Sequence, residues 1–113
     1  MRKNILIVDD DPDICNSLAI LFREEGYYVD ETTDSKEAAI LIKQDRHDVY
    51  LFDYTMKGAS GKDLLKMAKD VNPRCLVFII SGRVDIDKLC HKLADGIIIK
   101  PFDVEALLQR IAG

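Results

Sequence analysis

The 113-residue sequence predicts an α/β protein built around a parallel β-sheet. Two observations support this prediction. Short apolar runs and longer amphipathic runs alternate along the chain, in five strand-then-helix units. The strand runs are apolar at nearly every position, which is typical of parallel strands covered by helices on both faces. We therefore expect one doubly wound, five-stranded parallel sheet with helices on both faces.

Five short runs of mostly Ile, Val, Leu, Phe and Tyr are the predicted strands. They are residues 5–8, 27–31, 49–52, 76–80 and 97–99. The run at 76–80 is the most hydrophobic, whereas the run at 27–31 is more polar and gives a weaker strand signal.

The first predicted helix covers residues 12–25. Asp11 is a good N-cap and Pro12 a favoured first helical residue, while Gly26 is a typical helix terminator. Apolar residues recur with helical spacing and predict the buried face: Ile14, Leu18, Leu21 and Phe22.

The second and third predicted helices have clear boundaries. Asp34 and Glu37 resemble a capping box that opens a helix ending near Gln44. The next helix covers residues 61–71 and is broken at Pro73. Its inward-facing residues are expected to be Leu64, Ala68 and Val71.

The last two helices are marked by apolar residues at helical spacing. The fourth is short and is marked by Ile86, Leu89, Cys90 and Leu93. The fifth is capped by Asp103 and has an apolar face of Val104, Leu107, Leu108 and Ile111.

The composition, 48% apolar and 32% charged, is that of an ordinary globular domain. The net charge of -4 argues against a general nucleic-acid-binding surface, which would be basic. The longest apolar runs are too short to span a bilayer, and the first residues do not follow a signal-peptide pattern. We expect a cytoplasmic protein with no membrane segment and no direct nucleic-acid contact.

Cysteine and histidine residues do not form a recognisable site. Cys15, Cys75 and Cys90 are an odd number with no C-x-x-C spacing, so we expect mostly buried, reduced thiols. His47 and His91 lie away from the other polar clusters, and we expect both on the surface.

Polar residues follow four of the five predicted strands. Asp9 and Asp10 end the first, Asp53 the third, Ser81 the fourth and Lys100 the fifth. Because ligands of such sheets bind beyond the carboxyl ends of the strands, we expect these side chains to form one site. A helix cap or a turn would explain Asp53 by itself, but not the polar residues at the other strand ends.

The residue types at these strand ends suit phosphoryl transfer. Two carboxylates ~4 Å apart repel by about 4 kcal/mol at an effective dielectric constant near 20, so the cluster needs a cation or protonation. Oxygen ligands at a partly open site favour Mg²⁺. Lys100 adds a positive charge and Ser81 a hydrogen-bond donor. Asp53 can then act as a nucleophile that forms an aspartyl phosphate.

Four segments around these residues resemble the receiver domain of two-component response regulators. They are ILIVDDDPDI at 5–14, FDYTMKGASG at 52–61, FIISG at 78–82 and IIIKPF at 97–102. Each motif is short, but their order and their positions at four strand ends are specific. The resemblance covers the whole chain and implies one receiver domain over residues 1–113.

The resemblance implies a flavodoxin-like sheet with strand order 2-1-3-4-5. It also implies a phosphorelay protein that takes its phosphoryl group from a sensor histidine kinase or a phosphotransfer protein and then switches conformation. Such a protein catalyses only its own phosphorylation and dephosphorylation. It acts on a downstream output domain or protein, and we expect no output domain within these residues, because the sequence ends soon after the fifth helix.

The resemblance also implies a role for each site residue. Asp53 is the phosphoacceptor, Lys100 binds the phosphoryl oxygens and precedes a cis peptide at Pro101, and Ser81 is the hydroxyl that moves to the phosphate. The implied ligands of Mg²⁺, direct or through water, are Asp9, Asp10, Asp53 and the backbone carbonyl of Thr55.

Three features depart from the family pattern. Lys57 stands where the family usually has proline, and Ile97 where it usually has Tyr or Phe. The segment from Ser81 to Lys100 is also about three residues short, close to one helical turn. We therefore expect intact phosphorylation chemistry and an atypical output surface.

Two alternatives remain at this point. The first is a protein-interaction module of the same fold that is not phosphorylated. The second is an aspartyl-phosphate phosphatase of the haloacid-dehalogenase class, which usually has an acid two residues after its nucleophile, where this chain has Thr55.

Overall fold

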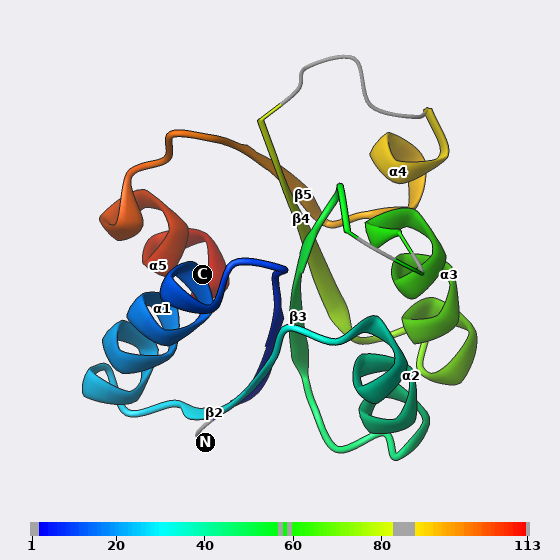
Figure 1. Ribbon diagram of the computed structural model, residues 1–113, viewed down its shortest axis with the longest axis horizontal. Coiled ribbons are helices and arrows are strands. Elements are labelled where there is room, and N and C mark those ends of the chain that lie inside the picture. The colour runs from blue at the N-terminus through cyan, green and yellow to red at the C-terminus, as the bar shows by residue number, and fades with distance from the viewer. Residues whose placement is uncertain (1–2, 57, 59, 83–87, 113) are drawn as a thin grey trace.

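The computed structural model describes residues 3–56, 58, 60–82 and 88–112 (Figure 1). Its strands are β1 (Asn4–Val8), β2 (Tyr28–Thr32), β3 (Val49–Asp53), β4 (Leu76–Ser81) and β5 (Gly96–Ile99). Its helices are α1 (Pro12–Glu24), α2 (Ser35–Lys43), α3 (Gly61–Val71), α4 (Lys88–Leu93) and α5 (Val104–Ala112). These elements confirm the predicted alternation of strand and helix.

The five strands form one parallel sheet in the order β2-β1-β3-β4-β5. Helices α1 and α5 cover one face, and α2, α3 and α4 cover the other (Figure 1). The architecture and the strand order implied by the family resemblance are therefore confirmed.

Successive residues of each central strand enter two different hydrophobic cores. One core lies against α2, α3 and α4 and includes the strand residues Leu6, Val8, Tyr50 and Phe52. The other lies against α1 and α5 and includes Ile5, Ile7, Val49 and Leu51. Because both faces of the sheet are buried, the strand sequences are apolar at consecutive positions.

Aspartate side chains begin three of the helices as predicted. Carboxylate oxygens of Asp11, Asp34 and Asp103 accept hydrogen bonds of 2.9 to 3.0 Å from backbone N–H groups two residues later. These bonds satisfy N–H groups that have no partner within the helix. At the other end of α1, Gly26 adopts a φ of 94°, the left-handed conformation common after helix ends.

The prediction that His47 lies on the surface is wrong, because this residue is 4% exposed. Its Nε2 atom lies 2.7 Å from Oδ2 of Asp30 on the edge strand β2. Its ring also packs edge-on against Tyr50, with ring centroids 5.8 Å apart. The polar partner and the ring contact offset part of the cost of burying the imidazole, whose Nδ1 has no hydrogen-bond partner among the described residues. His91, by contrast, is exposed as predicted.

The predicted inward position of Val71 is also wrong, since Val71 is 37% exposed. It is the last residue of α3 and lies almost one turn beyond Ala68, the last buried residue of that helix. Two markers of the fourth helix, Ile86 and the side chain of Leu89, lie outside the described residues.

The three cysteines are buried and form no disulfide among the described residues, as expected. None of the described helices has the length and apolar character needed to cross a bilayer.

Candidate functional site

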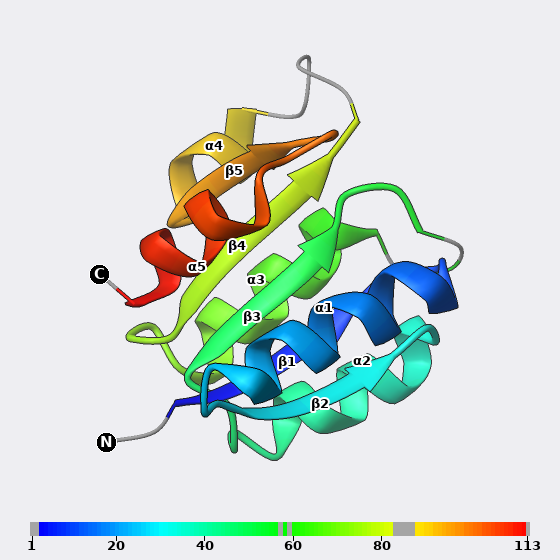
Figure 2. The same cartoon turned by 90° about the vertical axis from the view of Figure 1, so that its left-hand side faces the viewer.

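The carboxyl ends of the parallel strands meet at one edge of the sheet (Figure 2). Asp9 directly follows β1, Asp53 is the last residue of β3, and Ser81 is the last residue of β4. Lys100 directly follows β5, and its backbone N–H donates to the carbonyl oxygen of Ser81 at 2.7 Å. The fold therefore brings these four predicted site residues to one edge.

Lys100 lies between the two buried carboxylates of this edge. Its Nζ atom is 3.6 Å from Oδ2 of Asp9 and 3.6 Å from Oδ2 of Asp53. The side chains of Asp9 and Asp53 are only 3% and 12% exposed. The peptide bond from Lys100 to Pro101 is cis, as the family resemblance implied. One ammonium group thus faces two carboxylates, at distances longer than direct hydrogen bonds.

Asp9 is held by two hydrogen bonds, but one of its carboxylate oxygens accepts none among the described residues. Its Oδ1 accepts a hydrogen bond from the backbone N–H of Asp11 at 2.9 Å, and its backbone carbonyl accepts one from the Cys15 thiol. Its Oδ2 is buried and accepts no hydrogen bond from any residue that the structure describes. Burying a carboxylate oxygen without a hydrogen-bond donor is unfavourable, and the ammonium group of Lys100, 3.6 Å away, compensates its charge only in part. This oxygen is therefore a strong candidate to bind a cation.

The carboxyl group of Asp53 is unusually basic. Burial raises the pKa of Asp53 to about 6, and the nearby negative charge of Asp9 contributes to this increase. Lys100 and the backbone N–H of Thr55, 3.4 Å from Oδ1 of Asp53, oppose the increase. The charged form of Asp53 is thus incompletely compensated by the protein, and an additional cation would favour it.

The other predicted metal ligands lie at the exposed rim of the site. Asp10 is exposed and lines a cavity of about 340 Å³ together with Thr33, Asp34 and Ser35. Thr55 is also exposed. Among the described residues, no three Asp, Glu, His or Cys side chains are close enough to form a metal site by themselves. The donor set fits Mg²⁺, which keeps several water ligands and needs few protein ligands.

Gly61 has a steric role that the sequence reasoning did not identify. It is buried at the start of α3, and its backbone N–H donates to the carbonyl oxygen of Tyr54 at 3.1 Å. A Cβ atom at this position would lie 2.5 Å from the carbonyl oxygen of Asp53 and 2.8 Å from Cα of Tyr54. Only glycine lets α3 begin this close to the end of β3. Its position shortly after Asp53 was the available sequence signal.

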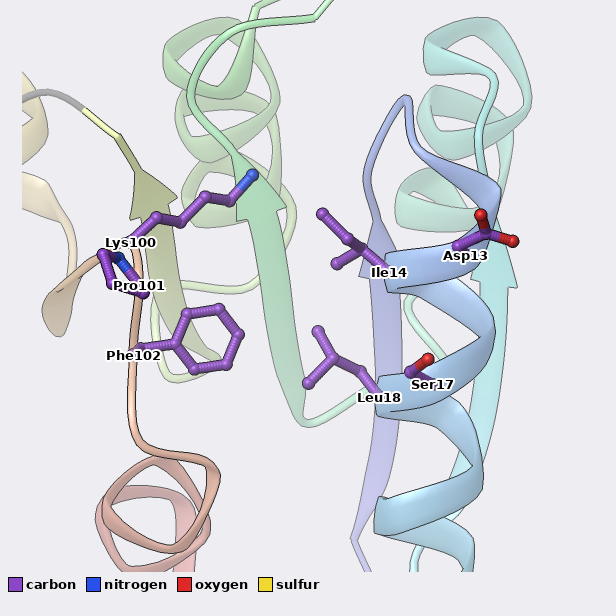
Figure 3. A pocket seen from close by; sticks show the side chains of 7 residues that line it. All are labelled: Asp13, Ile14, Ser17, Leu18, Lys100, Pro101 and Phe102. Carbon is purple, nitrogen blue, oxygen red and sulfur yellow. The ribbon is translucent and has the colours of Figure 1, made fainter.

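An apolar groove of about 590 Å³ lies beside the site (Figure 3). Ile14 and Leu18 point from α1 towards Phe102 on the segment that follows β5, and Lys100 lies at one end of the groove. The groove is lined by Asp13, Ile14, Ser17, Leu18, Lys100, Pro101 and Phe102. The sequence reasoning placed Ile14 and Leu18 on a buried face, and it missed the contribution of Phe102.

Of the two residues that differ from the family pattern, Ile97 and Lys57, the structure describes only Ile97. Ile97 lies in β5 opposite Ile79 of β4 and is partly buried against the core that faces α3 and α4. Lys57 lies outside the described residues.

The chain matches the model of the response regulator receiver domain over residues 5–112. The DNA-binding response regulator MtrA of Mycolicibacterium smegmatis is 29% identical over 113 residues, which are 98% of this chain and 50% of MtrA. The chain spans about half the length of the curated relatives that it matches.

Solved structures of other response regulators are also similar to this chain. A receiver domain protein (CheY-like) from Methanospirillum hungatei is similar with a TM-score of 0.93 and 29% identity, covering 99% of this chain and 92% of that one. A response regulator from Burkholderia pseudomallei, solved with a phosphorylated aspartic acid, a calcium ion and citrate, has a TM-score of 0.86 and 26% identity. That similarity covers 96% of this chain and 65% of that one.

Proposed function

The chain belongs to the response regulator receiver domain family, and we propose that it accepts a phosphoryl group on Asp53 in two-component signalling. The observation that best supports this proposal is the position of Asp53 itself. Its carboxylate ends a buried strand, next to Asp9 and 3.6 Å from the ammonium group of Lys100. A nucleophile, a cation and a second carboxylate suited to a metal are thus combined at one edge.

In the proposed reaction, a carboxylate oxygen of Asp53 attacks the phosphorus atom of a phosphohistidine. The new O–P bond forms as the N–P bond breaks, and the histidine of the donor leaves with the electron pair. Lys100 is close enough to Asp53 to bind a phosphoryl oxygen once Asp53 is modified. Ser81, buried at the end of β4, is the proposed hydroxyl partner of the phosphoryl group.

Mg²⁺ would be held by Asp9, Asp10, Asp53 and the backbone carbonyl of Thr55, directly or through water, and would neutralise charge on the phosphoryl oxygens. Asp9 is the best supported of these ligands, because its Oδ2 is buried without a hydrogen-bond partner among the described residues. The exposed position of Asp10 suits a contact through water.

The proposed phosphoryl donor is a sensor histidine kinase or a phosphotransfer protein in the cytoplasm. The groove between α1 and residues 100–102 is a suitable docking surface, because it is apolar and Lys100 lies at its end (Figure 3). Asn16, Arg23 and Glu24 on the exposed face of α1 are candidates to select the kinase. The output is a downstream domain or protein that responds to the phosphorylated form of this receiver domain.

The test is incubation with acetyl phosphate and Mg²⁺, followed by intact-mass measurement. We expect a single phosphoryl adduct on the wild-type protein and on the control variant Asp70→Asn, which changes an exposed carboxylate. We expect no adduct on Asp53→Ala, and none on the wild type in excess chelator. An equal adduct on Asp53→Ala would refute the assignment of the phosphoacceptor.

Two other outcomes would favour other functions. Absence of any adduct on the folded wild-type protein would favour an interaction module that is not phosphorylated. Rapid turnover of acetyl phosphate without an accumulated adduct would favour a phosphatase.

A further inference from the structure

The short connection between β1 and α1 carries Asp9 and Asp10, two of the proposed Mg²⁺ ligands, and Cys15 of α1 contacts both of its ends. The backbone N–H of Cys15 donates to the carbonyl oxygen of Asp11 at 3.1 Å. The Cys15 thiol donates to the carbonyl oxygen of Asp9 at 3.3 Å. One residue of α1 therefore holds the connection on both sides of Asp10.

The same thiol also links the connection to the neighbouring strand. Sγ of Cys15 lies 3.6 Å from the carbonyl oxygen of Thr32, the last residue of β2. The backbone N–H of Asp9 donates to this same carbonyl oxygen at 3.3 Å. Cys15 and Asp9 are each 2% exposed, so water cannot readily replace the thiol as a partner of the Asp9 carbonyl.

These contacts restrict the side chain of Asp9 as well as its backbone. Its N–H and its carbonyl oxygen are both bonded, and its Oδ1 accepts a hydrogen bond from the backbone N–H of Asp11 at 2.9 Å. The remaining oxygen, Oδ2, lies 3.6 Å from Nζ of Lys100. It accepts no hydrogen bond from the described residues and is the atom best suited to bind a cation. A ligand atom that is fixed before the metal arrives needs less ordering when the metal binds.

We propose that Cys15 is a positioning residue for the metal site: its thiol holds the backbone of Asp9 and thereby fixes where the Asp9 carboxylate lies. The proposal rests on the proposed function, because it assumes that Asp9 binds Mg²⁺. Cys15 itself is neither a proposed metal ligand nor a proposed phosphoryl contact. It acts only through its hydrogen bond to the Asp9 carbonyl.

Cys75 provides a matched control for Cys15. It is also 2% exposed, and its thiol also donates to a backbone carbonyl oxygen, that of Ala68 at 3.7 Å. It lies directly before β4, at the amino edge of the sheet, whereas the proposed metal site is at the carboxyl edge. Alanine at either position removes one buried sulfur atom and one thiol hydrogen bond. The difference between Cys15→Ala and Cys75→Ala therefore isolates the contact with Asp9.

Two further variants separate the hydrogen bond from the packing of the sulfur atom. Cys15→Ser keeps a donor at this position but is smaller, so it should recover much of what Cys15→Ala loses. Cys15→Val fills the space but cannot donate, so it should be impaired like Cys15→Ala. If Cys15→Ala does not fold, Cys15→Val replaces it as the variant without a donor. A role in packing alone predicts the opposite order, with valine closer to wild type than serine.

The experiment measures the Mg²⁺ dissociation constant by titration and, in the metal-free protein, the hydrogen exchange of the Asp9 and Asp11 amides. We expect Cys15→Ala to weaken Mg²⁺ binding about tenfold, the lower end of the range for residues that orient metal ligands, and to speed exchange at both amides. Cys75→Ala should leave both properties within about twofold of wild type. Cys15→Ser should bind Mg²⁺ within about threefold of wild type.

The proposal is overturned if Cys15→Ala and Cys75→Ala have the same Mg²⁺ affinity and the same exchange rates at Asp9 and Asp11. It is also overturned if Cys15→Ser remains as impaired as the variants without a donor. A wild-type protein that binds no Mg²⁺ would instead refute the proposed metal site. In that case the exchange rates of the metal-free variants still decide whether Cys15 holds Asp9.

Discussion

The carboxylates at the two edges of the sheet differ in how closely other groups of the protein pair with them. At the amino edge, where the strands begin, carboxylates are closely paired. Oδ2 of Asp48 accepts a hydrogen bond from the backbone N–H of Asn4 at 2.9 Å. Oδ2 of Asp95 accepts from the backbone N–H of Val77 and from Nζ of Lys69, both at 2.8 Å. These carboxylates join neighbouring segments and stabilise the fold.

At the carboxyl edge, Asp9 and Asp53 each accept one hydrogen bond from a backbone N–H group, but their ion pairs with Lys100 are longer. Oδ2 of Asp9 accepts no hydrogen bond within the described part of the chain. Lys100 stays 3.6 Å from both Asp9 and Asp53, too far for a direct hydrogen bond to either. The carboxylates at the amino edge are therefore compensated by short hydrogen bonds, whereas the negative charges at the carboxyl edge are compensated only in part. Incomplete charge compensation at a fixed position is typical of a binding site.

We expect the largest change in stability when a carboxylate at the amino edge is removed. Asp95→Ala should lower the free energy of unfolding by about 2 to 3 kcal/mol, because it leaves the N–H of Val77 without its acceptor and removes one of the two acceptors of the Lys69 ammonium group, which keeps the carbonyl oxygen of Cys75. Urea unfolding measures this loss, with Asp70→Asn as an exposed control expected within about 0.5 kcal/mol of wild type. A loss no larger than that of the control would show that the amino edge is not a stabilising edge.

At the carboxyl edge, replacing a carboxylate should stabilise the folded protein instead of destabilising it. Asp53→Asn should raise the free energy of unfolding by about 1 to 2 kcal/mol at neutral pH without Mg²⁺, because it removes a buried charge next to Asp9. The measurement is again urea unfolding, now in the presence of chelator. Destabilisation by Asp53→Asn would mean that the wild-type carboxylate is well compensated by the protein.

The third predicted effect is the pH dependence of that difference. The pKa of Asp53 is raised from 3.8 to about 6 on folding, so between these pH values the folded state binds more protons than the unfolded state. The wild type should therefore lose stability relative to Asp53→Asn as the pH rises through this window, by at most about 1.4 kcal/mol per pH unit. Unfolding curves at several pH values between 4 and 7 measure it. A difference between the two proteins that does not change with pH would contradict the raised pKa.

Local sequence patterns were sufficient to predict most of the fold and the position of Asp9, Asp53, Ser81 and Lys100 at one edge of the sheet. The helix caps at Asp11 and Asp103 depend only on residues near them in the chain. The meeting of Asp9, Asp53 and Lys100 followed from a general rule, because parallel strands place their carboxyl ends at the same edge. These predictions needed no knowledge of individual contacts.

Contacts between distant segments could not be predicted in this way. The burial of His47 depends on Asp30, 17 residues earlier, and on the ring of Tyr50. Ser35 begins α2 and Gly58 follows β3, and nothing in either local sequence indicates that a Cβ atom added at Gly58 would lie 2.6 Å from Oγ of Ser35. The role of Asp95 similarly depends on Lys69 and Val77, which the folded sheet brings next to it.

Thermal unfolding with and without Mg²⁺ tests most directly whether the carboxyl edge is an incomplete site that requires a cation. A ligand that binds only the folded state stabilises it by RT ln(1 + [L]/Kd), about 1.4 kcal/mol at ten times the dissociation constant. We predict that Mg²⁺ raises the unfolding midpoint of the wild type and of Asp70→Asn, and raises that of Asp53→Asn much less. An equal increase in all three proteins, or no increase in the wild type, would contradict the account.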